Sequence, residues 1–158
     1  MRKLVITGLL LATALPGVAQ AQTRREVVED ARDLRDAQRD LRQAQRYGDR
    51  RDVREARRDV RDARRDYREE LRDYRQRNRQ LYRQGAYVGP RGYRYQPASV
   101  SGRLAAPLYA RNHYVANPGR YRLPPAARNT HWVRHGNDVL LVDVRTGRVL
   151  DVNRNFFW

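Results

Sequence analysis

The sequence predicts an α+β protein: a long arginine-rich amphipathic helix or helical hairpin, a flexible linker, and a small C-terminal antiparallel β-meander. Three observations predict this class. A seven-residue apolar repeat runs through the first half, a stretch rich in tyrosine, proline and glycine follows, and β-branched runs separated by turn residues close the chain. The expected regions are a signal peptide at 1–21, a heptad helical region at 22–84, a linker at 85–118 and a β-domain at 119–158.

Residues 1–21 have the features of a secretory signal peptide. Two basic residues precede an apolar stretch, a proline–glycine break follows, and an A-x-A cleavage pattern ends at Ala21. The apolar stretch of about 12 residues is too short for a bilayer, which needs roughly 20. The chain has no cysteine, which excludes disulfides, thiolate metal sites and lipid attachment to an N-terminal cysteine. We expect cleavage after Ala21 and a periplasmic location.

The cations of the mature chain are arginines. Loss of Arg2 and Lys3 with the signal peptide leaves 32 of the 34 basic residues against 18 acidic ones, a net charge of about +14. A guanidinium stays charged at any ordinary pH and can bind phosphate or carboxylate in a bidentate way. This composition favours anionic partners such as a membrane or cell-wall surface, whereas export argues against nucleic acid.

Residues 24–84 have the composition and periodicity of a long helix, with 21 arginines, 15 acidic residues, one glycine and no proline. Apolar residues recur every seven positions in two blocks, and alanines stand three positions behind several of them in an a/d pattern. The repeating apolar positions are Val27, Leu34 and Leu41 in the first block and Val53, Val60, Tyr67, Tyr74 and Leu81 in the second.

The repeat slips between the two blocks, because twelve residues rather than a multiple of seven separate Leu41 from Val53. The slip falls at Gly48-Asp49, where glycine can end one helix and aspartate can cap the next. The sequence therefore favours a hairpin of about 24–46 and 50–84. One unbroken rod of about 61 residues is the alternative.

Charges flank the apolar seam of the second block. Aspartates at 52, 59, 66 and 73 take g positions, while Arg57 and Arg64 take e positions, so two such helices can pair acid against base. This predicts self-association through the heptad helices or pairing with a partner coiled coil. The alternative is a solvated face with local acid–arginine pairs, each contributing a few tenths of a kcal/mol.

Residues 85–118 carry no regular apolar period. Six of the seven prolines and six tyrosines fall within 85–125, among glycines and arginines. Such a composition predicts a flexible linker. Interleaved tyrosine and arginine can stack on nucleic-acid bases, but the chain shows no recognised nucleic-acid fold.

The last part of the chain predicts three strands at about 130–135, 139–144 and 148–153. Gly136-Asn137 suits a two-residue hairpin turn, and Gly147 suits the left-handed position of a three-residue turn. The expected register sets Val144 opposite Arg148, Val142 opposite Leu150 and Leu140 opposite Val152, which makes one face nearly all apolar. Three strands cannot close a barrel, so we expect the aromatic end, 156–158, to pack on the meander.

His131 and His135 are the candidate metal ligands, because they lie four residues apart with Asp138 close behind. On a helix they would share one face and could chelate one ion. In the predicted strand they stand about 13 Å apart at about 3.3 Å per residue. One ion at about 2 Å from each imidazole cannot bind both. We assign no metal ligand and expect both rings to pack on, or at the rim of, the Val133 side; single-site or intermolecular binding stays open.

The C-terminal region resembles the RcnB family, small periplasmic proteins associated with nickel and cobalt homeostasis. The resemblance covers about 119–158 and excludes the arginine heptads. It is carried by the runs YRLPPA, HWVRHGNDVLLVDVRTGRVLDV and NRNFFW. Its ordered residues are Leu123-Pro124-Pro125, Trp132-Val133, Gly136-Asn137-Asp138, Asp143 and Gly147. The resemblance implies a periplasmic role in modulating nickel or cobalt export, with a partner protein handling the metal.

The sequence carries no arrangement typical of an enzyme, so we assign no catalytic and no cofactor-binding residue. Ser99 and Ser101 lie in the linker, a Gly-rich phosphate loop is absent, and Asp138 and Asp143 suit turn and cross-strand positions. Two functions follow. One is an RcnB-like accessory protein that contacts an efflux-system or envelope protein. The other is a structural or interaction protein whose arginine-rich helix binds anionic envelope surfaces.

Overall fold

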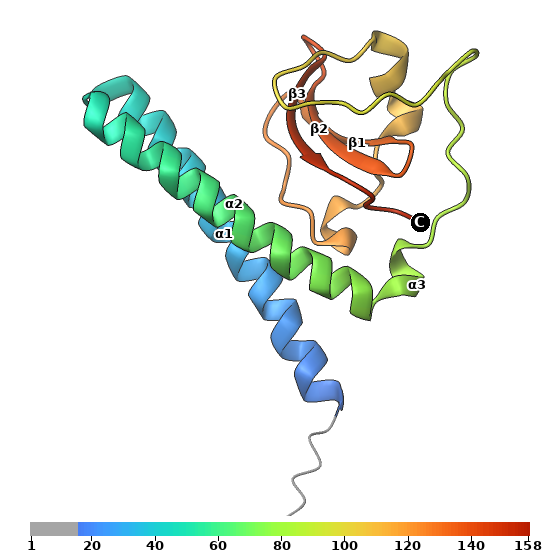
Figure 1. Cartoon of the computed structure of the whole chain (residues 1–158), viewed down its shortest axis with the longest axis horizontal. Helices are drawn as coiled ribbons and strands as arrows, with labels where there is room; N and C mark the ends of the chain where they lie inside the picture. Colours follow the sequence, from blue (N-terminus) through green and yellow to red (C-terminus); the bar gives the residue numbers. More distant parts are fainter. Residues whose placement is uncertain (1–15) are drawn as a thin grey trace, which may run out of the picture.

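The computed structural model describes the backbone of residues 16–158 and the side chains from Arg25 onward. Two long helices, α1 (Pro16–Tyr47) and α2 (Arg50–Arg77), form an antiparallel hairpin, and a single turn, α3 (Arg79–Tyr82), follows. Three strands, β1 (Thr130–His135), β2 (Asp138–Asp143) and β3 (Arg148–Asn153), form a sheet in the order β1-β2-β3 beside the C-terminal half of α2 (Figure 1). The predicted α+β class is confirmed.

The expected signal peptide, 1–21, lies largely outside the described residues, and its cleavage stays a prediction. Over the part of the chain that the structure describes, no helix combines the length and the apolar character needed to cross a bilayer.

The turn between α1 and α2 is built by Gly48 and Asp49. The Asp49 carboxylate accepts hydrogen bonds from the backbone N–H groups of Arg51 (2.5 Å) and Asp52 (2.9 Å), and the Asp52 carboxylate accepts one from Asp49 N–H (3.0 Å). This capping box satisfies N–H groups that the first turn of α2 leaves free. A Cβ on Gly48 would lie 2.9 Å from the Ala44 carbonyl oxygen, so a larger residue would disturb the turn. The hairpin, rather than the rod, is what the chain forms.

The heptad positions of the two helices pack against each other inside the hairpin. On α1, Val27, Ala31 and Leu34 are buried. On α2 the buried residues are Ala56, Val60, Tyr67, Leu71 and Tyr74. The predicted a positions 60, 67 and 74 are thus core residues, and the partner of the α2 seam is α1 of the same chain. Helix α2 stops at Arg77, short of the expected 84, where the Asn78 side-chain amide donates to the Tyr74 carbonyl (2.8 Å).

The three strands begin and end within one residue of their predicted positions. Gly136, with φ +63°, and Asn137 form the two-residue turn from β1 to β2. Between β2 and β3 the predicted pair Leu140–Val152 is present, but Val142 pairs with Val149 instead of Leu150.

The predicted register was wrong near the second turn for a local reason. The Asp143 carboxylate accepts hydrogen bonds from the N–H groups of Arg145 (2.9 Å) and Thr146 (3.2 Å), which ends β2 at Asp143 and lengthens the turn by one residue. Leu150 then bulges out of the ladder and restores the pairing beyond it. Gly147, at φ +71°, takes the left-handed position as predicted.

The segment 85–118 is not a free linker, and the expected flexible connection is wrong in this respect. Backbone hydrogen bonds join Ser101 N–H to Val149 O (2.8 Å), Leu104 N–H to Gly147 O (2.9 Å) and Val115 N–H to Trp132 O (2.8 Å). Its short helical turns are Ala106–Tyr109 and Arg111–His113, with Pro118–Tyr121 just beyond. The segment lacks a period because it follows the sheet edges as loop, yet its backbone bonds and apolar side chains are used there.

Both faces of the sheet are therefore covered. On one face Trp132, Val139 and the C-terminal Phe156 and Phe157 join the hairpin core. On the other face a second cluster, Val133, Leu140, Val142, Val149 and Val152, is covered by Ala98, Leu104, Tyr109 and Tyr114. The predicted packing of the aromatic end holds for the two phenylalanines, which are buried, whereas Trp158 is 36% exposed.

Candidate functional site

The structure places His131 and His135 in β1, as the strand prediction required. The exposed His131 ring stacks on Tyr114 with 4.2 Å between ring centroids. His135 is buried, with Nε2 at 2.9 Å from the Gln96 carbonyl oxygen and the rings of Tyr93 and Tyr95 beside it. Residues four apart on a strand stand about 13 Å apart. The two rings thus serve separate packing contacts and do not converge on one ion.

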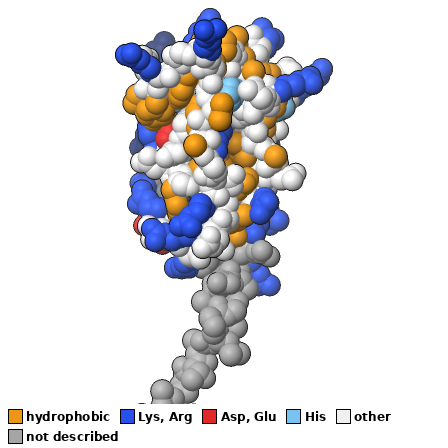
Figure 2. Space-filling model, turned by 90° about the vertical axis from the view of Figure 1, so that its right-hand side faces the viewer, with side chains coloured by type: hydrophobic (Ala, Val, Ile, Leu, Met, Phe, Trp, Pro, Cys, Tyr) orange, Lys and Arg blue, Asp and Glu red, His pale blue; other side chains and the backbone are white. Residues whose placement is uncertain are grey.

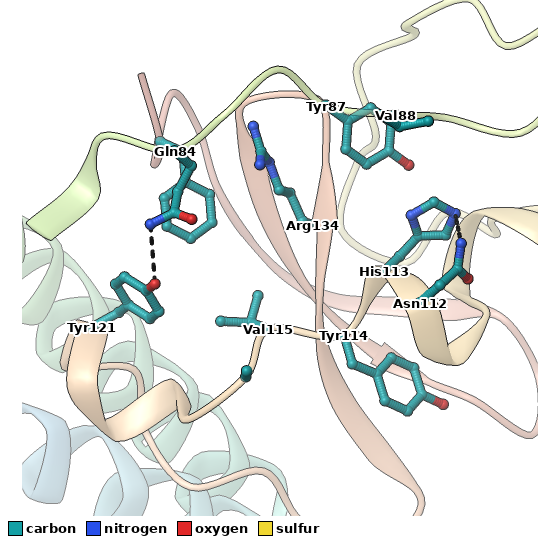
Figure 3. Close-up of a pocket in the computed structure, with 11 residues that line it drawn as sticks. Gln84, Tyr87, Val88, Asn112, His113, Tyr114, Val115, Tyr121 and Arg134 are labelled. Atoms are coloured by element: carbon teal, nitrogen blue, oxygen red, sulfur yellow. Dashed lines mark hydrogen bonds between the residues drawn. The ribbon is translucent and has the colours of Figure 1, made fainter.

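A cavity of about 410 Å³ opens at the outer edge of β1, between that strand and the loop segments that cross it. Figure 3 shows Arg134 between Gln84 and Tyr87, with His113 and Asn112 beside Tyr87. The ring centroids of Tyr87 and His113 are 5.3 Å apart. Phe157 and the backbone around Val115 complete the wall. The lining residues are Gln84, Tyr87, Val88, Asn112, His113, Tyr114, Val115, Ala116, Tyr121, Arg134 and Phe157.

Arg134 is the cation of this cavity, and its contacts hold it in place. Its Nε donates to Gly136 O (3.0 Å), and Nη2 donates to Gly85 O (2.8 Å). The guanidinium lies 5.3 Å from the ring centroid of Phe157 and 5.8 Å from that of Tyr87. Burial lowers the pKa of Arg134, which nevertheless stays a cation at neutral pH. The cavity therefore has a positioned positive charge among aromatic rings.

The side of the cavity formed by Tyr87, Asn112 and His113 is polar and uncharged at neutral pH. His113 is buried, and burial lowers the pKa of its imidazole, an effect that a backbone hydrogen bond at Pro107 opposes. Asn112 Nδ2 stands 3.4 Å from His113 Nε2. The Tyr87 hydroxyl is buried without a hydrogen-bond partner among the described residues. A ligand in this cavity would thus face one cation and a neutral imidazole.

Sequence reasoning missed His113. It lies in the non-periodic segment, and only the folding of that segment over β1 brings it across from Arg134. The bridge between Tyr114 and Val133 sets this approach. Nothing in the run RNHY would have distinguished this histidine from a linker residue.

The buried carboxylates of the C-terminal region are engaged in structural contacts. Asp138 accepts from the Tyr95 hydroxyl (2.7 Å), Arg154 Nη1 (3.0 Å) and Asn155 N–H (2.8 Å), so it joins the loop, the sheet and the C-terminal segment. Asp151 accepts from Arg68 Nη2 (2.7 Å) of α2. Among the described residues, no three His, Cys, Asp or Glu side chains gather as a metal site.

Hydrophobic side chains occupy much of the middle of the face shown in Figure 2, with histidine among them and arginines projecting at the rim. The fold and cavity define a class: a small three-strand domain that presents an arginine–aromatic cavity and is carried on an arginine-rich helical hairpin.

Residues 102–151 match the family model RcnB, described as nickel/cobalt transporter regulator. The resemblance inferred from the C-terminal motifs is confirmed, and the match begins inside the segment expected to be linker. It covers β1, β2, most of β3 and seven of the eleven residues that line the cavity, Arg134 and His113 among them, but not the hairpin. No curated protein and no solved structure matches the chain.

Proposed function

We propose that this protein is an exported, non-enzymatic accessory that modulates nickel or cobalt efflux, or envelope metal homeostasis, in the manner of RcnB proteins. The observation that carries the proposal is the family match over residues 102–151, whose description is that of a nickel/cobalt transporter regulator. The signal-peptide features of residues 1–21 support export to the periplasm.

The geometry supports action through a partner rather than through a shared ion on β1. His131 stacks on Tyr114 and His135 bonds the Gln96 carbonyl, so each imidazole already has a packing role. We propose the cavity around Arg134 and His113 as the contact site for the efflux system, because both residues lie in the matched segment and place a cation and a neutral imidazole in one cavity.

Growth of a deletion strain under nickel or cobalt stress tests the proposal. Complementation with the full chain is expected to restore wild-type tolerance. His113→Gln, which changes the cavity wall, is expected to restore it only in part. His131→Gln is the matched control, because that ring lies outside the cavity and is exposed. Unchanged tolerance in the deletion strain would refute the metal role, and full rescue by His113→Gln would refute the cavity as the contact site.

Titration calorimetry with nickel and cobalt addresses direct binding. The two histidines of β1 are spread along an extended strand. We therefore expect that the mature protein does not bind one nickel or cobalt ion tightly through both His131 and His135. Saturable binding of one ion per chain that disappears in His131→Ala/His135→Ala would contradict this expectation.

A second function is favoured by the surface of the hairpin. Most of its arginines are exposed. The ion pairs formed within α1 or within α2, such as Arg39–Asp36 and Arg65–Asp62, lie on the surface. We propose that this basic surface can hold the protein on an anionic envelope surface. Sedimentation with anionic vesicles is expected to fall steeply between low and high salt. Binding that ignores salt would count against it.

A further inference from the structure

A cluster of three arginines lies where the end of α2 meets the C-terminal segment, away from the cavity around Arg134. Arg72, Arg75 and Arg79 line a hollow of about 540 Å³ together with Gln76, Asn155 and Trp158. The two parts of this wall are nearly eighty residues apart in sequence and are brought together by docking of the sheet on α2. We name this hollow the arginine–tryptophan site.

No aspartate or glutamate side chain of the described chain lines the arginine–tryptophan site. Within residues 25–158, none of the ion pairs closer than 4.0 Å involves Arg72, Arg75 or Arg79. Guanidinium groups that line one hollow repel one another. Burial lowers the pKa of Arg75, and the positive charge of Arg72 lowers it further. A bound anion would relieve this repulsion.

Arg75 is held in position before any ligand arrives. Its guanidinium lies 4.9 Å from the ring centroid of Trp158 and 5.2 Å from that of Phe156, and its Nη2 donates to the Asn155 carbonyl. Its Nε is buried without a partner among the described residues. Arg79 also lies over Trp158, at 5.9 Å. The site therefore combines a positioned cation, two exposed cations and one partly exposed aromatic ring.

We propose that the arginine–tryptophan site binds a phosphate monoester carried on a sugar ring. A phosphate monoester carries about −1.5 to −2 charge at neutral pH and three acceptor oxygens, which suits three guanidinium groups better than a carboxylate does. The exposed part of Trp158, beside the arginines that lie over its ring, offers an apolar contact for the sugar that bears the phosphate. The hollow exceeds the size of a bare ion, for which one cation pair would suffice.

This inference goes beyond both functions proposed above, because it names one localised ligand rather than a metal role or general charge attraction. Arg75 also anchors the C-terminal segment, so its removal could unfold the docking. The test therefore uses Arg72 and Arg79, which are exposed and take part in no ion pair within the described residues.

The experiment measures binding of glucose 1-phosphate to the mature full-length protein by titration calorimetry. Trp158 fluorescence, measured in a Trp132→Phe background, is a second readout. Saturable binding is expected, with inorganic phosphate weaker and glucose not bound. Arg72→Gln/Arg79→Gln is expected to weaken binding about tenfold. The control is Arg51→Gln/Arg58→Gln, which removes two exposed arginines, also seven residues apart, near the start of α2 and outside the site. This variant is expected to leave the affinity unchanged.

Several results would overturn the proposal. Glucuronate binding as tightly as glucose 1-phosphate would reject the phosphate class, and equal binding of inorganic phosphate would leave no role for the sugar. Equal losses in the two arginine pairs would reduce the effect to net charge. Trp158→Ala with undiminished affinity would remove the tryptophan from the site.

The source of the phosphorylated sugar can be separated in the same design. Vesicles that carry a phosphorylated saccharide lipid are compared with vesicles of phosphatidylglycerol at matched charge. Capture that depends on Arg72 and Arg79 and that glucose 1-phosphate displaces supports a membrane-anchored ligand. Binding of the soluble ester without such capture supports a free sugar phosphate. Absence of both contradicts the proposal.

Discussion

The two halves of α2 share one heptad repeat but pack in different ways. In the N-terminal half the buried residues are small, Ala56 and Val60. In the C-terminal half, Tyr67, Leu71 and Tyr74 are buried in one cluster with α1 and sheet-domain residues, and Tyr67 and Tyr74 contact Arg122. Figure 1 shows the same division, since the tip of the hairpin extends beyond the sheet.

The tyrosines of the docked half explain a choice that looks poor for a coiled coil. The Tyr67 hydroxyl donates to Arg122 O (2.9 Å), and Arg122 in turn lies 5.2 Å from the Tyr74 ring centroid. Just beyond α2, in α3, the Tyr82 hydroxyl donates to Tyr121 O (3.0 Å). A leucine seam would pack two helices better, but it could not bond these carbonyl groups. The repeat thus specifies the hairpin, and its departures from leucine specify the docking.

The largest expected effect separates the two halves directly. Tyr67→Ala removes a side chain with no exposed surface and is expected to lower the free energy of unfolding by about 3–5 kcal/mol. Val60→Ala in the other half is expected to cost only about 1–2 kcal/mol. Urea unfolding followed by circular dichroism checks both. Equal losses would mean that docking adds nothing to the helix–helix seam.

Asp151 supplies the polar part of the docking. It is buried and bonds Arg68 Nη2 at 2.7 Å, with Arg64 Nε at 3.9 Å, while Arg68 also donates to Val152 O. Asp151→Asn is expected to cost about 1–3 kcal/mol, because it removes charge-assisted bonds and leaves guanidinium groups near a neutral partner.

The matched control is Asp62→Asn, which breaks the exposed pair with Arg65 at 3.1 Å and is expected to cost under about 0.5 kcal/mol. Thermal unfolding of both variants at one salt concentration gives the comparison. A double-mutant cycle of Asp151→Asn with Arg68→Gln should show coupling. Independent effects would contradict the role given to this ion pair.

Alkaline pH should weaken the docked half before the hairpin tip. Burial raises the pKa of Tyr67 and Tyr82 above the ordinary value of about 10. The unfolded chain therefore loses these protons first, and the stability that neutral phenols provide falls as pH rises above about 10. At those pH values the arginines remain charged.

The measurement follows the fluorescence of Trp132 and Trp158 for the docked domain and far-ultraviolet circular dichroism for the helices between pH 8 and 12. The fluorescence signal is expected to change first. Tyr67→Phe/Tyr82→Phe keeps the rings, removes the titrating groups and should flatten the pH dependence. An unchanged slope in that variant would assign the effect to other groups.

Sequence alone predicted the parts of this fold that depend on local periodicity. The heptads gave the helices, the slip at Gly48-Asp49 gave the hairpin, and alternation with two turn signals gave the meander. Val142 was assigned the wrong partner because the carboxylate of Asp143 shortens β2, a side-chain effect that alternation does not encode.

The sites were less predictable than the fold. The extended spacing of His131 and His135 followed from the strand, but the cavity at Arg134 needs His113 from a segment without periodicity. That segment reads as linker because its backbone bonds reach distant partners, such as Leu104 N–H to Gly147 O. Long-range pairing of irregular chain has no short-range signature, so composition suggested flexibility where the structure shows contact.

The smallest expected effect concerns the undocked end of the hairpin. Asp49 caps α2 through two backbone N–H groups, and these hydrogen bonds lower the pKa of its carboxyl group. Asp49→Ala is expected to cost about 1 kcal/mol, and Asp49→Asn much less, because asparagine also caps well. Hydrogen exchange should show faster opening around residues 50–54 while protection of Tyr67 and Leu71 changes little. Loosening that spreads to those docked residues would show that the two halves of α2 unfold as one unit, in spite of their different packing.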